Sequence, residues 1–385
     1  MTSQATTLAF VESPVQLLNV LEWAHAEALR GPADRPAAAP LLTGVPAQRG
    51  ARPPALPGLL IVVLPPLDPM SRGQLRRMAA LARDEGHEVR WQEARGSGTA
   101  PLKALAALAR EVRDAERVVV GDPFSRYVQL LLTLVRAERL VVVDDGTATM
   151  EFVSQLARGE RLVRWHRAGT RGLSRRGREL AYAPVSAAAR RRFTPRPGHR
   201  VEVFSSMPVT VPDGVRLTVN DFAWTRAAFG PPRIGRGTDL VGTSLVETGV
   251  VDADRYRAAV RALTAEHGAG RYFAHRRESQ TKLHALAEAT GLEIVRPDLP
   301  LELVARRGPV GRTIVSFPST VVHTLPYALR GTGVTVAVVD VDPQWLTGTA
   351  SPRARHFLAD VTGTARDVRR FATIGPPPPA AAPAG

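Results

Sequence analysis

The chain has 385 residues, enough for two domains that each bury a hydrophobic core. Hydrophobic residues make up 44% and charged residues 23%, values that exclude a wholly disordered chain. The formal net charge is +15, yet 49 of the 51 cationic residues are arginines and only Lys103 and Lys282 are lysines. This bias, together with abundant Ala, Gly and Pro, is typical of GC-rich coding, so the charge alone does not predict nucleic-acid binding.

Cysteine is absent, which excludes disulfides, thiolate nucleophiles, zinc ribbons and iron–sulfur clusters. Residues 1–10 lack the basic start of a signal peptide, and no apolar run approaches the roughly 20 residues that span a bilayer. We therefore expect a soluble or peripheral protein, in the cytoplasm or at the inner face of the cytoplasmic membrane.

Short apolar runs alternate with amphipathic stretches in residues 1–225, the pattern of a mostly parallel α/β sheet. Thr7–Val11 predicts the first strand, followed by a turn and a helix from about Val15 to Leu29. The segment 31–57 is rich in Pro, Ala and Gly and predicts a long loop. Further strands are expected at 59–64, 88–91, 117–120 and 140–143, and helices at 71–85, 101–115 and 124–137.

An arginine-dense segment follows, with 13 arginines between Arg158 and Arg200. Its apolar residues are too broken for a strongly periodic helix, so we expect an exposed excursion. Such an excursion is either simply solvated or docks on an anionic membrane surface or an acidic glycan. Edge strands are expected at 201–204 and 216–219, and residues 226–238 are the best linker candidate.

A second α/β series occupies residues 239–375. Strands are expected at 239–241, 270–274, 292–295, 313–316 and 335–340, and helices at 252–267 and 277–289. Residues 376–385 predict a disordered tail. The fold class is therefore α/β, with two Rossmann-like domains, 1–225 and 239–375, expected to face each other across a cleft.

Polar residues that directly follow the strands of the first domain are candidates for a site, because ligands of open parallel sheets bind beyond the carboxyl ends of strands. Asp144 and Asp145 precede Gly146, so one carboxylate can serve as a general base for a hydroxyl while the other braces the turn. An ordinary turn with a helix cap is the simpler interpretation. Ser13, Gln16 and Asn19 follow the first strand, where they would orient a sugar acceptor, although a Ser-Pro helix start explains Ser13 equally well.

The second domain offers two sites of the same kind. His275 follows a strand and precedes Arg276; at a helix start it suits a phosphate, and neighbouring arginines favour phosphate over a metal. A structural histidine is the alternative. Ser316, Ser319 and Thr320 surround a turn that enters a helix, where hydroxyls and N–H groups suit an anion, unless they form only a helix cap.

Taken in order, these sites resemble the motifs of bacterial sialyltransferases and polysialyltransferases of the GT-B type. That family carries an acidic motif ending in Gly, a later His-Pro motif and then a Ser/Thr-rich motif, which Asp144–Gly146, His275 and Ser316–Thr320 follow in order. Arg276 stands where the family has Pro. The first strand with Ser13–Gln16, and the run Gly242–Glu247, also look like actinobacterial members of this family.

The resemblance implies a metal-independent, cofactor-free, inverting transfer of sialic acid, or a related keto-sugar acid, from a CMP donor to a glycan hydroxyl. Asp145, or else Asp144, would remove the acceptor proton, and His275 would contact the departing phosphate. The remaining donor contacts would be Ser316, Ser319, Thr320, Thr243, Ser244 and Arg276. The expected partners are thus a nucleotide sugar and a glycan.

Three alternatives remain open. Asp340 and Asp342 form an Asp-x-Asp pair that could hold a metal on a nucleotide diphosphate, although a turn is the commoner explanation. A GT-B glycosyltransferase with a UDP or GDP donor is the second. A non-enzymatic basic protein that binds nucleic acid or anionic surfaces is the third, but aromatic residues make up only 5% and no specific nucleic-acid motif is visible.

Overall fold

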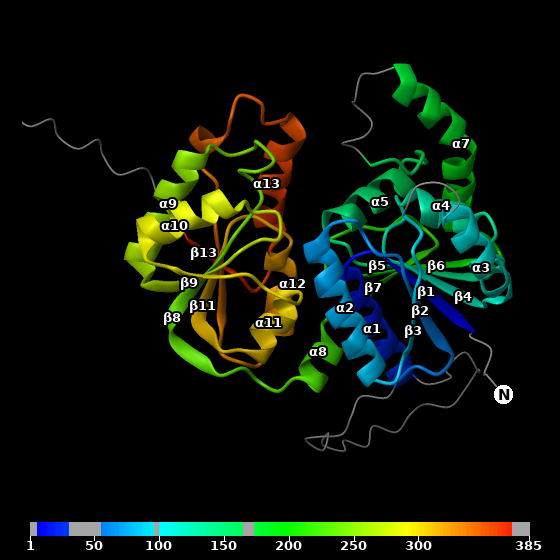
Figure 1. Cartoon of the computed structure of the whole chain (residues 1–385), viewed down its shortest axis with the longest axis horizontal. Coiled ribbons are helices and arrows are strands. Elements are labelled where there is room, and N and C mark those ends of the chain that lie inside the picture. The colour runs from blue at the N-terminus through cyan, green and yellow to red at the C-terminus, as the bar shows by residue number, and fades with distance from the viewer. Residues whose placement is uncertain (1–5, 31–54, 96–99, 165–172, 372–385) are drawn as a thin grey trace, which may run out of the picture. The chain divides into compact units, whose positions relative to one another are not determined.

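Two parallel β-sheets, each accompanied by helices, make up the computed structural model, which describes residues 6–30, 55–95, 100–164 and 173–371 (Figure 1). The chain divides into two units, Met1–Ala228 and Phe229–Gly385. Both units are Rossmann-like, because each sheet is entirely parallel and its strands alternate with helices. Most of the predicted loop, residues 31–54, and the predicted tail at 376–385 lie outside the described residues.

Unit 1 is built on a seven-stranded sheet of order β3-β2-β1-β4-β5-β6-β7. Its strands are β1 (Thr7–Val11), β2 (Leu59–Val63), β3 (Glu88–Trp91), β4 (Arg117–Val120), β5 (Arg139–Val143), β6 (Arg200–Ser205) and β7 (Val215–Val219). Every residue of β1 and β2 is buried, as expected of parallel strands covered on both faces. The direction in which strands are added reverses between β1 and β4.

The helices of unit 1 are α1 (Pro14–Arg30), α2 (Pro69–Asp84), α3 (Ala100–Asp114), α4 (Arg126–Leu132), α5 (Thr147–Ala157), α7 (Leu173–Phe193) and α8 (Ala223–Ala228). Helix α1 packs against α2 and α8, whereas α4 packs against α3 and α7. The core that these helices cover is mainly aliphatic with several phenylalanines, and it includes buried residues from β1, β2, β4, β5 and β6.

Unit 2 is built on a six-stranded sheet of order β10-β9-β8-β11-β12-β13. Its strands are β8 (Ile234–Val241), β9 (Ala269–Phe273), β10 (Glu293–Val295), β11 (Val310–Ser316), β12 (Thr335–Val339) and β13 (Arg369–Phe371). Its helices are α9 (Ala253–His267), α10 (Gln280–Thr290), α11 (Leu301–Arg307), α12 (Val321–Ala328) and α13 (Pro352–Thr364), with a short 3₁₀ helix, η1 (Pro343–Trp345). Here the strand order reverses between β8 and β11.

The arginine-dense segment corrects two predictions. It contains the 21-residue helix α7 rather than only an exposed excursion, and Ala189 and Phe193 of that helix are fully buried. The ring of Phe193 packs edge-on against Phe152, with 5.1 Å between centroids. Residues 201–204 belong to β6, which lies between β5 and β7 and is not an edge strand. The helix packs through a few isolated small and aromatic residues. Because arginines surround them in the sequence, the helical spacing of these apolar residues was not recognisable.

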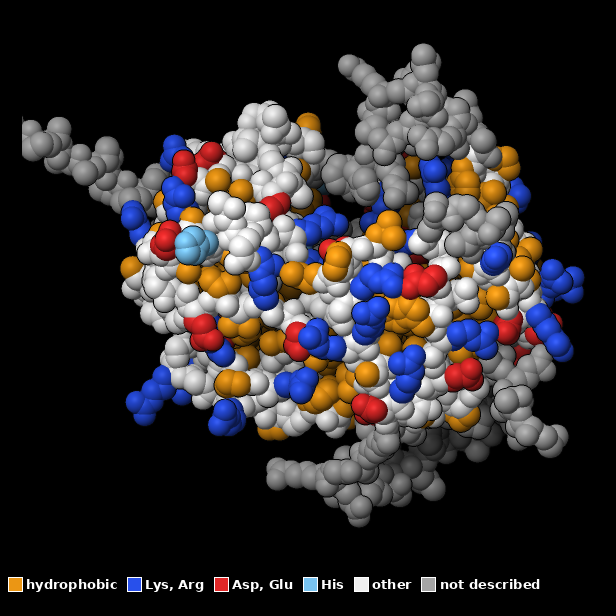
Figure 2. Space-filling model, in the orientation of Figure 1, with side chains coloured by type: hydrophobic (Ala, Val, Ile, Leu, Met, Phe, Trp, Pro, Cys, Tyr) orange, Lys and Arg blue, Asp and Glu red, His pale blue; other side chains and the backbone are white. Residues whose placement is uncertain are grey.

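Cationic side chains do not gather into a single patch on the face drawn in Figure 2, where Lys and Arg are scattered among acidic and apolar groups. On this face, therefore, the described residues form no localised basic surface. In the part of the chain that the structure describes, no helix has the length and apolar character needed to cross a membrane.

The two central strands of unit 2 approach each other closely at Gly311. The buried carboxylate of Asp239 accepts the Gly311 N–H at 2.6 Å and also pairs with Arg271 at 2.7 Å. The register between β8 and β11 shifts just after Gly311. A Cβ at this position would lie 2.5 Å from the carbonyl oxygen of Gly237, a backbone atom that cannot rotate away.

We therefore expect Gly311→Ala to lower the free energy of unfolding by about 1–3 kcal/mol, the usual cost of overpacking. Gly270→Ala in β9 is the control, since a Cβ there meets no atom within 4 Å. Urea denaturation of both variants gives the comparison. Equal losses in the two variants would contradict the close approach of β8 and β11.

Candidate functional site

The carboxyl ends of the central strands carry the polar residues of both units. Neighbouring loops diverge where the strand order reverses, and ligands of open α/β sheets bind there. In unit 1 the strand order reverses between β1 and β4, which we call the switch point of the sheet. Glu12 follows β1 and Asp122 follows β4, one on each side of it, and Asp145 follows the adjacent β5. In unit 2, Thr243 follows β8 and Ser319 follows β11. Each unit thus presents a polar edge at its switch point.

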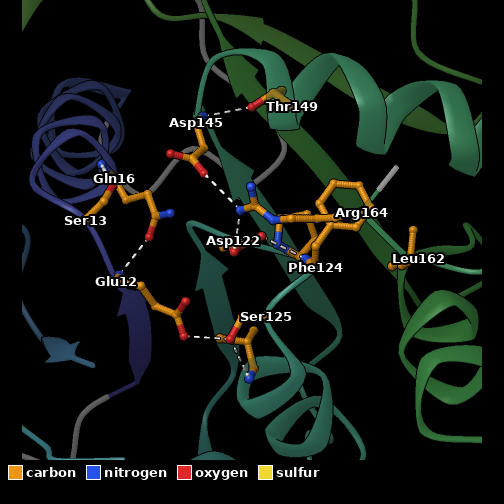
Figure 3. A network of polar contacts seen from close by, with 12 residues as sticks. Glu12, Ser13, Gln16, Asp122, Phe124, Ser125, Asp145, Thr149, Leu162 and Arg164 are labelled. Carbon is orange, nitrogen blue, oxygen red and sulfur yellow. Dashed lines mark hydrogen bonds and ion pairs between the residues drawn. The ribbon is translucent and has the colours of Figure 1, made fainter. Parts of the chain in front are cut away.

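Three carboxylates and one guanidinium meet at the edge of unit 1 (Figure 3). Arg164 donates to Asp122 at 2.7 Å and lies 3.7 Å from the carboxylate of Asp145. Asp122 also accepts the Phe124 N–H at 2.9 Å, and Arg164 lies over the Phe124 ring. One arginine therefore bridges the loops that follow β4 and β5.

The third carboxylate, Glu12, lies deeper in the same edge. Ser125 donates its hydroxyl to Glu12 at 2.6 Å, and Arg95 forms an ion pair with the other oxygen. Burial raises the pKa of Glu12. The positive charge of Arg95 lowers this pKa, whereas the negative charge of Asp122 raises it further. Burial alone would lower the pKa of Arg164, but the carboxylates of Asp122, Asp145 and Glu12 raise it. Arg164 is therefore a permanent cation among these acids.

The structure separates the roles of the two adjacent aspartates. Asp144 is 2% exposed; it accepts the Gly146 N–H at 2.9 Å and both the N–H and the hydroxyl of Ser206 at 3.2 and 3.1 Å. Burial raises its pKa, while hydrogen bonds from Thr149 and the backbone oppose that rise. The side chain of Asp145 keeps 19% of its surface exposed. Asp144 thus braces the turn, and Asp145 is the carboxylate that a substrate can reach.

The three predicted acceptor residues lie at the start of α1. Ser13 accepts the Gln16 N–H at 3.2 Å, as a helix cap does. Gln16 accepts the Glu12 N–H at 2.7 Å, and in Figure 3 its amide nitrogen turns toward the side of Asp122 and Arg164. Gln16 is 3% exposed, so its oxygen is held within the fold at the end of β1 while its amide nitrogen faces this edge.

Asn19 instead holds the frame of the site. Its amide nitrogen donates to the Asp144 carbonyl at 2.8 Å, and its oxygen accepts from Asn220 at 2.8 Å. It is 2% exposed. The geometry therefore gives Asn19 a positioning role toward Asp144 in place of the predicted contact with an acceptor.

In unit 2, His275 is an uncharged hydrogen-bond donor. Burial and the charges of Arg276, Arg277 and Lys282 lower its pKa to about 4. Its Nδ1 accepts the Arg277 N–H at 3.2 Å, so the proton of the neutral ring is on Nε2. His275 therefore offers an Nε2–H beside the exposed Arg276.

The turn between β11 and α12 has hydrogen-bond donors that no protein group accepts from in the described part of the chain. Ser316 is 1% exposed and donates to the Phe317 carbonyl at 2.7 Å, so it supports the turn. Thr320 occupies the cap position of α12 but makes no side-chain cap bond, so the helix-cap explanation does not account for it. Within the described part of the chain, the backbone N–H groups of Ser319, Thr320 and Val321 donate to no other group. Unused N–H groups at a helix start bind anions.

Thr243 and Ser244, which were predicted to contact the nucleotide sugar, lie after β8, next to this turn. Thr243 is 6% exposed, and its carbonyl accepts from Lys282 at 3.0 Å. The Ser244 carbonyl accepts both the N–H and the hydroxyl of Thr248 at 2.9 Å. These contacts fix the loop that separates His275 from the β11–α12 turn.

The Asp-x-Asp alternative is explained by local structure. Asp342 caps η1 and accepts the Gln344 N–H at 2.8 Å, as a turn aspartate does. Among the described residues, no group of three His, Cys, Asp or Glu side chains is arranged to hold a metal ion.

Three charged residues of this edge were not predicted from the sequence: Glu12, Asp122 and Arg164. The first two directly follow strands that the sequence predicted, so the rule applied to Asp144 and Asp145 would have found them. Arg164 carries no local signal, because it is one arginine among the many between Arg158 and Arg200. Only the fold brings it to Asp122 and Asp145.

No protein-family model and no curated protein matches the chain. Similar solved structures include an α/β-galactoside α-2,3-sialyltransferase from Photobacterium phosphoreum (8% identity, TM-score 0.46, 94% of this chain and 98% of that chain). The GT-B domain of a Photobacterium damselae sialyltransferase gives 9% identity and a TM-score of 0.44, over 96% and 100% of the two chains. Heptosyltransferase WaaC from E. coli gives 14% and 0.38, over 89% and 91%. Similarities this distant assign no substrate or reaction.

The two aspartates should differ in their effect on stability. Asp144→Ala leaves the buried donors of Gly146 and Ser206 without their acceptor, so we expect a loss of about 2–3 kcal/mol in the free energy of unfolding. Asp145→Ala should cost less than about 1 kcal/mol, because this side chain is partly solvated. Chemical denaturation measures both, and a larger loss for Asp145→Ala would contradict the assignment.

The ring of His275 should titrate far below an ordinary histidine. Because its folded pKa of about 4 lies below the ordinary histidine value of about 6.5, this group favours the folded state above pH 6.5. Its contribution is lost as the pH falls from 6.5 towards 4. Ring NMR signals recorded against pH test this, and a His275 pKa above about 6, the ordinary range, would contradict the buried environment.

Proposed function

We propose that the protein is an inverting glycosyltransferase that moves sialic acid, or a related keto-sugar acid, from a CMP-linked donor to a glycan hydroxyl. The observation that carries the proposal is a set of hydrogen-bond donors at the edge of unit 2. There the Nε2–H of His275 and the unused N–H groups of Ser319, Thr320 and Val321 lie at the ends of β9 and β11. These strands flank β8, so the strand axes from which the two sets of hydrogen-bond donors extend are about 10 Å apart.

This separation suits a nucleotide-sugar substrate that carries two anionic groups. A CMP-linked keto-sugar acid carries a phosphate and, on the same anomeric carbon, a carboxylate. Uncharged donors such as a neutral imidazole, backbone N–H groups and the hydroxyls of Ser319 and Thr320 can share both anions, and Arg276 adds a positive charge. The same edge would hold one phosphate of a UDP or GDP donor, and the carboxylate beside the phosphate is what distinguishes the CMP-linked keto-sugar acid from these donors.

Unit 1 supplies the acid–base chemistry of the proposed reaction. Asp145 takes the proton from the acceptor hydroxyl as the oxygen attacks the anomeric carbon. The bond from that carbon to the phosphate oxygen breaks, and CMP leaves with the electron pair. Arg164, 3.7 Å from the Asp145 carboxylate, orients this side chain, and Gln16 is placed to donate to the acceptor. A single displacement of this kind inverts the anomeric configuration.

Leaving-group stabilisation in this scheme comes from the chain's own donors, and we propose that the reaction needs neither cofactor nor metal ion. The Nε2–H of His275 strengthens its bond to the phosphate as negative charge develops there. Attachment to an anionic membrane through the arginine-dense segment 158–200 remains a separate proposal, to be tested by sedimentation with acidic vesicles.

Incubation with CMP-sialic acid and a panel of glycans should release CMP in the presence of EDTA. Asp145→Ala and His275→Ala should each lower the rate by about 10²–10⁴, the usual contribution of a general base or a charge-stabilising donor. Asp254→Ala and His284→Ala are matched controls, because both side chains are exposed on α9 and α10.

Transfer that survives both site substitutions would contradict the mechanism, and release that requires a divalent metal would contradict its metal independence. A thermal-shift panel of CMP, UDP and GDP identifies the nucleotide. Stabilisation by UDP or GDP but not by CMP would replace the proposed donor with the alternative one.

A further inference from the structure

Lys282 stands out in a chain that uses arginine for 49 of its 51 cationic residues. It lies in the first turn of α10, and its side chain is 11% exposed. Its ammonium has three acceptors: a Glu278 oxygen at 2.7 Å, the Thr243 carbonyl at 3.0 Å and a Glu247 oxygen at 3.4 Å. It also lies 4.2 Å from the centroid of the Tyr256 ring. All three N–H groups of the ammonium thus have acceptors within the protein.

Glu278 connects this cation to His275. Its side chain is fully buried; one oxygen accepts the His275 N–H at 2.6 Å, and the other accepts the Tyr272 hydroxyl at 2.6 Å. Tyr272 in turn shares a hydrogen bond of 2.7 Å with Tyr256. Burial raises the pKa of Glu278, and Lys282 opposes that rise. Without the ammonium, a buried carboxylate would lose its counter-charge.

The loop after β8 rests directly on the same carboxylate. A Cβ at Gly242 would overlap the Glu278 oxygen and the Tyr272 hydroxyl, so only glycine allows this approach. Further along this loop, Glu247 accepts the Ser279 N–H at 3.2 Å. Two loops, 242–247 and 275–279, are therefore held together by one buried ion pair.

We propose that Lys282 and Glu278 form a clamp that positions the His275 ring and the Thr243 backbone for the donor phosphate. The inference rests on the proposed function of this edge and deepens it. Lys282 is a positioning residue, because its three N–H directions are used within the protein. Lysine suits this place better than arginine, since an ammonium presents three donors from one point to acceptors in different directions, whereas a guanidinium is a planar fork.

The clamp is first tested on the chain without any ligand. Lys282→Met removes the charge, Lys282→Arg keeps it, and Lys103→Met replaces the only other lysine, which is exposed on α3. In Lys282→Met we expect the His275 amide to exchange with solvent about tenfold faster or more, because its acceptor is no longer fixed. The ring pKa of His275 should also rise, since one nearby positive charge is gone.

If Lys282→Met does not fold, Lys282→Arg still tests the clamp. We expect it to preserve the low ring pKa of His275 and the midpoint of thermal unfolding, yet to weaken CMP binding about tenfold, because misplacing a binding group by about an ångström has effects of this order or greater. Lys282→Met should weaken binding about tenfold to a hundredfold. Lys103→Met should match the wild type in all measurements.

An unchanged His275 amide exchange in folded Lys282→Met would overturn the clamp. Equal CMP affinity of Lys282→Arg and the wild type would also overturn it, because charge alone would then suffice. If the wild type binds no CMP but the His275 amide is released in Lys282→Met, the proposed donor is wrong while the clamp stands.

Discussion

At the centre of each sheet, the chain reverses the direction in which it adds strands, between β1 and β4 and between β8 and β11. Parallel strands need crossover connections, so this reversal sends successive loops to opposite sides of the strand ends. The polar groups of Glu12, Asp122, Ser319 and Thr243 all lie at these two points. The position of the candidate site therefore follows from topology before any particular side chain is considered.

Charge is then distributed differently at the two edges. In unit 1, the arginines Arg95 and Arg164 pair with carboxylates and leave Asp145 within reach of a substrate. In unit 2, the buried ion pair of Lys282 and Glu278 lies behind a histidine that is kept neutral. The first arrangement suits removal of a proton, and the second suits binding of anions by uncharged donors. Removal of a proton and binding of an anionic leaving group are the two functions that the proposed transfer requires.

The sequence was sufficient where burial produces a simple pattern. Runs such as Leu59–Val63 are apolar because both faces of a parallel strand are covered, and they were predicted within a residue of their bounds. The same logic placed Asp144, His275 and Ser319 at strand ends, as the structure has them.

Long-range pairing was beyond sequence analysis. Phe193 packs on Phe152, Arg164 reaches Asp122, and Lys282 bridges two loops, each across many residues. Which of two adjacent aspartates faces solvent depended on Ser206, 62 positions further along the chain. Such contacts depend on how strands are ordered in the sheet, which local periodicity does not report.

A crystal structure of the chain with CMP bound is the most direct measurement of where the donor phosphate lies. The geometry of unit 2 predicts a phosphate within about 3 Å of the His275 Nε2 or of the N–H groups of Ser319, Thr320 and Val321, the normal hydrogen-bond distance. CMP bound with its phosphate away from both donor sets would contradict the assignment of this edge to the donor.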